Sequence, residues 1–174
     1  MNALFDAVRE NQLACVLARN GSGAFMSMIG STLISEIINY QPHLSPAEIL
    51  TLLNVRVTKA LHQKQGELSS QDDGMDMALC SIDYAKNEII FAGANLSLTT
   101  IIRDELKEIR GDVFPIGGVF AKKEIRFSNK TIPIQSGLML YLYTDGYKDQ
   151  FGGLKKEKSR IRARRSGATC RWRC

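Results

Sequence analysis

Two aspartates follow a strongly apolar, strand-like segment near the C-terminal end of the chain. The stretch LYLYTDGYKDQFGG places Asp145 at the end of this segment and Asp149 four residues later. Carboxylate oxygens are the ligands that Mg²⁺ and Mn²⁺ prefer, so the pair is a candidate divalent-cation site. Gly146 follows Asp145, however, and an Asp-Gly dipeptide is also an ordinary turn signal. Asp149 can support such a site or simply hold the loop, and the two aspartates alone leave these interpretations open.

The other candidate ligands are scattered along the sequence. Asp73 and Asp76 belong to the block DGMD, where Asp76 begins a predicted strand and can face a site, while Asp73 reads as a solvated loop acid. His43 and His62 stand alone, which disfavours a histidine-based metal site or catalytic triad. The cysteines form no CxxC pair, so neither a zinc site nor a disulfide framework is supported. The four cysteines are Cys15, Cys80, Cys170 and Cys174.

The composition is that of one soluble globular domain. The chain has 174 residues, of which 44% are hydrophobic and 24% are charged. It has no apolar run of the roughly 18 residues that a membrane-spanning helix needs, and its first residues do not resemble a secretory signal. We therefore expect a cytoplasmic protein without a membrane segment. The net charge of +5 comes from residues 155–174, which carry +8 and leave −3 on residues 1–154.

The hydrophobic pattern predicts two helices and then a series of strands. Apolar residues recur at helical spacing in residues 22–41, where Ser22 can serve as the N-cap. A second helix is expected after Ser45, with Pro46 at its first position and Glu48 closing a capping box.

From Met75 onward the apolar period changes to two. Residues 75–84 and 87–94 predict a hairpin, and residues 96–109 a strand followed by a short helix or strand. Residues 123–135 predict a second hairpin that turns at residues 128–130, and residues 137–146 predict a further strand. Two helices followed by antiparallel strands indicate an α+β fold with the helices on one sheet face.

Five blocks occur in an order that makes the sequence similar to a known family. They are SGAFMSMIGSTLISEI, DGMDMALCSID, IIFAGANLSL, FPIGG and LYLYTDGYKDQFGG, and the resemblance that they carry covers roughly residues 22–158. Together they resemble the SpoIIE-like branch of the PPM-type serine/threonine protein phosphatases. The resemblance implies an antiparallel β-sandwich flanked by helices. It also implies two Mn²⁺ or Mg²⁺ ions, held by acidic side chains, which activate a water for attack on phosphoserine or phosphothreonine. In the TDG block of this family the aspartate is a metal ligand, and here that residue is Asp145.

The sequence also departs from the pattern of this family. An early Gly-Asp-Phe/Tyr motif and a final Asp-Asp pair are absent, so we expect a phosphatase-like fold without its first and last strands. The family motif Asp-Cys-Thr-Gly-His-Gly is replaced by CVLARNGS, with Cys15 in the place of the aspartate. A shifted reading frame restores part of that motif. We interpret residues 1–21 as a degraded or out-of-frame segment, residues 22–158 as a partial phosphatase domain, and residues 159–174 as a basic, aperiodic tail.

These observations predict a signalling phosphatase domain that is inactive in this truncated form. Its intact relatives would act on a phosphoprotein, such as an antagonist of an anti-sigma factor, and would carry an upstream sensor domain. The alternatives are a pseudophosphatase module that binds a phosphoprotein without cleaving it, or a non-functional gene remnant. The basic tail can attract nucleic acid, but it lacks interleaved aromatic residues, which disfavours that function.

Overall fold

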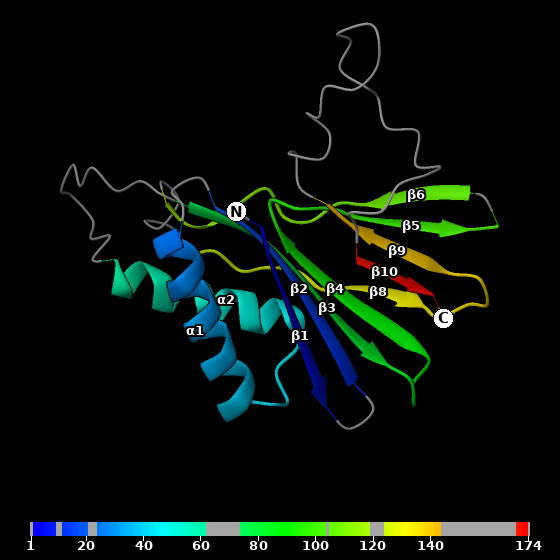
Figure 1. The fold of residues 1–174 in the computed structure, drawn as a ribbon, viewed down its shortest axis with the longest axis horizontal. Helices are drawn as coiled ribbons and strands as arrows, with labels where there is room; N and C mark the ends of the chain where they lie inside the picture. Colours follow the sequence, from blue (N-terminus) through cyan, green and yellow to red (C-terminus); the bar gives the residue numbers. More distant parts are fainter. Residues whose placement is uncertain are drawn as a thin grey trace, which may run out of the picture.

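The computed structural model of this chain describes residues 2–9, 12–20, 24–61, 74–103, 105–118, 124–143 and 170–173. These residues form two helices, a six-stranded sheet and a four-stranded sheet. Figure 1 shows both helices on one side of the larger sheet. The smaller sheet packs against the opposite face of the larger one, so the order of layers is helices, larger sheet, smaller sheet. The α+β sandwich expected from the sequence is therefore confirmed.

The larger sheet has the strand order β1-β2-β3-β4-β8, and the short strand β7 pairs with β3. All of these strand pairs are antiparallel. The predicted hairpin of β3 and β4 is confirmed, and it turns at residues 84–87, where Asn87 has a positive φ of 54°. The strands are β1 (Asn2–Arg9), β2 (Gln12–Asn20), β3 (Gly74–Asp83), β4 (Glu88–Ala94), β7 (Ile116–Gly117) and β8 (Lys130–Pro133).

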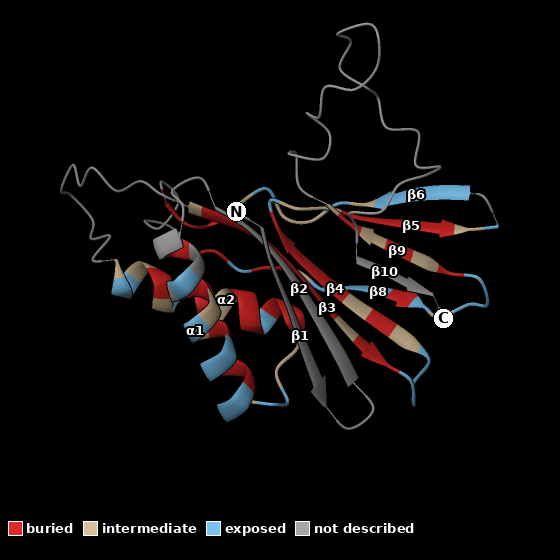
Figure 2. Ribbon diagram, in the orientation of Figure 1, coloured by how far each residue is buried: buried red, intermediate tan, exposed pale blue. Residues whose placement is uncertain are grey.

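The smaller sheet has the order β10-β9-β5-β6 and is also antiparallel. Of the two alternatives predicted for the end of residues 96–109, the structure has the strand, because β6 forms a hairpin with β5. Figure 2 shows β6 coloured as exposed along nearly its whole length, which is consistent with its place at the edge of the sheet. The strands are β5 (Leu98–Ile102), β6 (Glu105–Ile109), β9 (Met139–Leu142) and β10 (Cys170–Arg173).

Both predicted helices are present, as α1 (Ala24–Tyr40) and α2 (Pro46–Ala60). Ser45 is the N-cap of α2 and Pro46 occupies its first turn, as the sequence predicts. The Glu48 carboxylate accepts hydrogen bonds from the Ser45 backbone N–H at 2.8 Å and from the Ser45 hydroxyl at 2.7 Å. This contact fixes the start of a helix that packs on the larger sheet.

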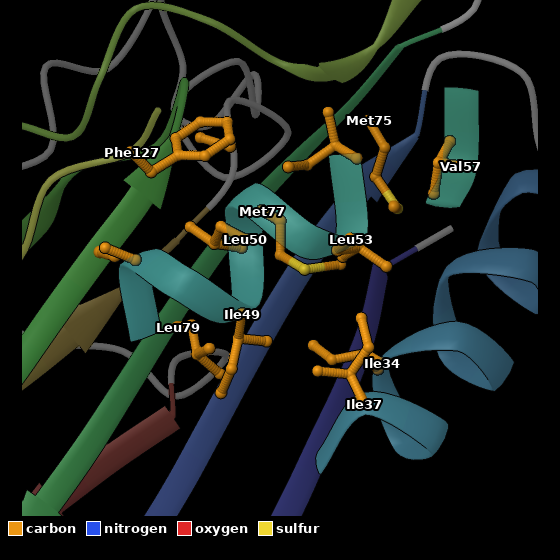
Figure 3. Close-up of a cluster of buried hydrophobic side chains, with 14 of the residues drawn as sticks. Ile34, Ile37, Ile49, Leu50, Leu53, Val57, Met75, Met77, Leu79 and Phe127 are labelled. Atoms are coloured by element: carbon orange, nitrogen blue, oxygen red, sulfur yellow. The ribbon is translucent and has the colours of Figure 1, made fainter. Parts of the chain in front are cut away.

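The core has two parts because successive residues of a strand point to opposite faces of its sheet. Met75, Met77 and Leu79 of β3 face the helices, where they pack with Leu50 and Leu53 of α2 (Figure 3). The intervening residues of β3 face the smaller sheet and pack with residues of β5 and β9. These are Ala78, Cys80 and Ile82 on β3, Leu98 on β5, and Leu140 and Leu142 on β9.

Two features differ from the sequence-based expectations. The hairpin predicted for residues 123–135 is wrong, because β8 pairs with β4 and residues 124–129 form no strand. Their alternating pattern arises instead because Ile125 and Phe127 insert between α2 and the larger sheet. The structure also places β1 and β2 within residues 1–21 and β10 within the tail, where no strand was expected. That these segments are degraded or out of frame stays a prediction.

Among the residues that the structure describes, no helix has the length and apolar character needed to cross a membrane.

Candidate functional site

One end of the sandwich collects the strand termini that carry the candidate residues of the sequence. β3 begins there and β4 ends there, because the two strands are antiparallel neighbours. β9 also reaches this end, since its last residue Leu142 lies opposite Leu98, the first residue of β5. Tyr143 follows, and its hydroxyl lies 3.1 Å from the hydroxyl of Thr99. The fold thus brings the start of β3, the end of β4 and the end of β9 to one place.

The principal candidate ligands, Asp145 and Asp149, lie outside the described residues, as does Asp73. Their assignment as metal ligands stays a prediction. Asp145 follows Tyr143, the last described residue of this segment, by two residues in the sequence.

Asp76 is the buried carboxylate at this end of the sandwich. Its exposed fraction is 8%, and its Oδ1 accepts a hydrogen bond of 3.0 Å from Nδ2 of Asn95. A buried carboxylate needs such a partner, because an unpaired charge away from water is costly. Asn95 has a φ of 57°, a left-handed conformation that asparagine tolerates better than most residues. The sequence-based expectation that Asp76 begins a strand is confirmed, since it lies in β3 near its first residue.

A close crossing of two glycines holds Asn95 in place. A Cβ atom on Gly93 or on Gly111 would collide with the carbonyl oxygen of Leu96, so neither position has room for a side chain. At this crossing Asp112 forms two backbone hydrogen bonds with residues at the end of β4. Its N–H donates to the Gly93 carbonyl at 2.8 Å, and its own carbonyl accepts the Asn95 N–H at 2.7 Å.

The Asp112 carboxylate extends this arrangement to a third segment. It accepts hydrogen bonds from the Ser128 N–H at 2.8 Å and from the Ser128 hydroxyl at 3.0 Å. Asp76, Asn95, Asp112 and Ser128 together form what we call the strand-end cluster. Asn95, Asp112 and Ser128 were not predicted as site residues from the sequence. The only signal for the first two is a nearby glycine, in the blocks GAN and GD.

The described residues do not fit a pair of divalent cations. No group of three histidine, cysteine, aspartate or glutamate side chains in this part of the chain lies close enough to hold a metal ion. Asp76 offers one carboxylate, and one of its oxygens already accepts a hydrogen bond from Asn95. Cys15, which the sequence resemblance predicts to replace a family aspartate, lies on β2 opposite Cys80. A thiolate is a poor ligand for Mg²⁺ or Mn²⁺. No catalytic step can be assigned to a metal on these residues.

His43 is exposed in the turn between α1 and α2, and His62 lies outside the described residues. Cys80 is buried between the two sheets. Among the described carboxylates, Glu48 and Asp83 have a lowered pKa, and each contacts a residue three positions away in the sequence. The pKa of Glu48 is lowered chiefly by the Ser45 hydroxyl, and that of Asp83 chiefly by the Lys86 backbone N–H.

Comparison with protein families decides the ancestry of the domain. Residues 21–171 match the family model of stage II sporulation protein E, which covers most of the chain. The chain belongs to the SpoIIE family. A comparison with curated protein sequences finds no match.

Solved structures of PPM/PP2C phosphatase domains share the fold of this SpoIIE-family chain. The match to the SiaA-PP2C domain of Pseudomonas aeruginosa covers 89% of this chain, with 24% identity and a TM-score of 0.75. The chain also resembles RsbX in complex with magnesium (13% identity, TM-score 0.61, 88% of this chain and 68% of that one). A third similar structure contains the PP2C domain of SpoIIE from Bacillus subtilis (13% identity, TM-score 0.60, 83% of this chain and 40% of that one).

The chain spans only 59% of the SiaA chain that it matches. This partial coverage agrees with the expectation of an incomplete PPM-type sandwich. At these levels of identity, the similar structures establish the fold of the chain and leave its chemistry to be argued from its own residues.

Proposed function

We propose that this chain is a phosphatase domain of bacterial signalling by descent, and that it turns over little or no substrate with its present set of acidic residues. Its intact relatives would remove phosphate from serine or threonine in a cytoplasmic phosphoprotein, such as an antagonist of an anti-sigma factor. The proposal is supported by the family match over residues 21–171 and by the shared sandwich fold.

The position of Cys15 carries the proposal of lost activity. This residue replaces the aspartate of the second family motif and lies in the middle of β2, where the chain pairs on both sides with neighbouring strands. Of the acidic residues at family positions, Asp145 is the one that the sequence retains, and Asp149 is a supporting candidate. A single carboxylate cannot hold two divalent ions beside a reactive water.

The direct test measures hydrolysis of p-nitrophenyl phosphate with Mn²⁺ or Mg²⁺ against a protein-free blank. We expect no metal-dependent turnover above the blank. Asp145→Asn is the matched variant, since it keeps the size of the side chain and removes its charge. Metal-dependent hydrolysis that this substitution abolishes would contradict the proposal and make Asp145 a working ligand.

A binding module is the second candidate function. The retained fold favours it, because a sandwich with a TM-score of 0.75 to a phosphatase domain can keep a docking surface after losing its ligands. It predicts binding of a phosphoserine peptide that chelator does not weaken, measured by calorimetry with the unphosphorylated peptide as control. DNA binding that falls steeply with salt and disappears on truncation after Gly153 would instead assign the function to the basic tail.

A further inference from the structure

A six-residue segment contacts α2 without joining either sheet. In residues 124–129, which we call the strap, the buried Ile125 and Phe127 alternate with the exposed Glu124 and Arg126. Ile125 and Phe127 are 6% and 7% exposed and belong to the core between α2 and the larger sheet. Figure 3 shows Phe127 in the same cluster as Leu50 and Leu53 of α2. The strap is therefore part of the core although it has no strand partner.

Side chains take the place of a strand partner for the strap. The Thr51 hydroxyl of α2 accepts the Phe127 N–H at 3.3 Å. Asp112 accepts both the N–H and the hydroxyl of Ser128. In return, the Asn129 side-chain oxygen accepts the Ala47 N–H at 2.9 Å, which satisfies a backbone donor in the first turn of α2.

These contacts differ from a strand ladder in one physical respect. Removing one strand from a sheet breaks a row of backbone bonds, whereas opening the strap breaks a few side-chain bonds and exposes the apolar side chains of Ile125 and Phe127. Because both sheet ladders stay paired, this opening should require less free energy than global unfolding. The contact between the Asn54 side chain and the Gly117 N–H, 2.7 Å long, lies elsewhere on α2 and does not involve the strap. It can hold α2 on the sheet while the strap is open.

We infer that the strap opens as one unit and that the Asp112 carboxylate, through its hydrogen bonds to Ser128, holds it closed. When it opens, Phe127 and Ile125 leave the core, and the first turn of α2 frays because Ala47 loses its contact with Asn129. The two sheets stay intact. The Asp112 carbonyl also accepts the Asn95 N–H, and the Asn95 side chain donates to Asp76. Asn95 therefore connects Asp112 to the buried Asp76 carboxylate. The inference does not depend on the proposed function.

Native-state hydrogen exchange on the full chain tests this inference. In Asp112→Ala we expect the Ser128 and Phe127 amides to exchange about tenfold or more faster, because hydrogen bonds to a charged group are lost. The Ala47 amide should accelerate with them, while the amides of the β3–β4 ladder keep their rates. Glu124→Gln is the control, since it removes only an exposed ion pair with Arg126 and should change none of these rates.

A second variant covers the case in which Asp112→Ala does not fold. Asn129→Ala removes the contact with α2 at an exposed position and should accelerate Ala47, Phe127 and Ser128 together. Acceleration of Ala47 alone would overturn the inference, because the strap and the helix end would then move separately. Equal acceleration of all core amides would also overturn it, because the strap would then open only when the whole domain unfolds.

Discussion

The helix-facing core and the strand-end cluster share the strands β3 and β4 but are held together by different interactions. The helix-facing core consists of apolar side chains whose stabilisation grows with the area removed from water and depends little on direction. The strand-end cluster relies on individual donors and acceptors, such as Asn95 with Asp76, and on the close approach of two glycines. The fold therefore depends mainly on the first region.

The largest expected effect comes from the helix-facing core. Leu53 of α2 is fully buried, so Leu53→Ala leaves a cavity and should lower the free energy of unfolding by about 2–5 kcal/mol. Val55→Ala is the matched control on the same helix, because Val55 is 59% exposed and its loss should cost less than about 0.5 kcal/mol. Urea denaturation of both variants measures the difference. Equal costs would mean that α2 does not pack on the sheet through Leu53.

The second-largest loss of stability is expected at the close crossing of Gly93 and Gly111. It tests whether the backbone beside the strand-end cluster can accommodate an added side chain. Gly93→Ala places a methyl group against the Leu96 carbonyl and the Gly111 backbone, and we expect a loss of about 1–3 kcal/mol from overpacking. Gly137→Asn is the control. Gly137 has a positive φ of 79°, but nothing lies near its missing Cβ and asparagine tolerates that conformation. A neutral Gly93→Ala would show that the crossing can move aside without cost.

The hydrogen bond between Asp76 and Asn95 should contribute less to the free energy of unfolding than either of the two preceding changes. We expect a coupling energy of about 1 kcal/mol between Asp76→Ala and Asn95→Ala in a double-mutant cycle. Each single variant should cost more than this coupling, since the partner is left without its hydrogen bond in a buried place. Strictly additive costs in urea denaturation would argue that the two side chains do not support one another.

The same comparison explains how much of the molecule the sequence could predict. α2 was predictable because its apolar period and its Ser45-Pro46-Glu48 start are local signals. The contacts of the strand-end cluster join residues far apart in sequence, 19 residues for Asp76 with Asn95 and 16 for Asp112 with Ser128. No periodicity encodes such contacts. The alternation in residues 124–127 predicted a strand, but it could not show that α2 and Asp112, rather than another strand, would bind the backbone.

The smallest expected effect concerns the exposed start of α2 and its dependence on pH. The pKa of Glu48 is lowered from its ordinary value, first by the Ser45 hydroxyl and then by the Ser45 backbone N–H. A carboxyl whose pKa is lower in the folded state binds protons more readily when unfolded. Its stabilising contribution is therefore present above the unfolded pKa and is lost as pH falls through the folded pKa.

Glu48→Gln should remove this contribution and leave the other carboxylates unchanged. Thermal unfolding between pH 7 and pH 3 should then show a slightly smaller drop in Tm for the variant than for the wild-type chain. Glu124→Gln is a suitable comparison, because Glu124 is exposed and contacts Arg126 rather than a helix end. If the variant and the wild-type chain lose the same Tm over this range, the contact between Glu48 and Ser45 does not contribute to the stability of α2.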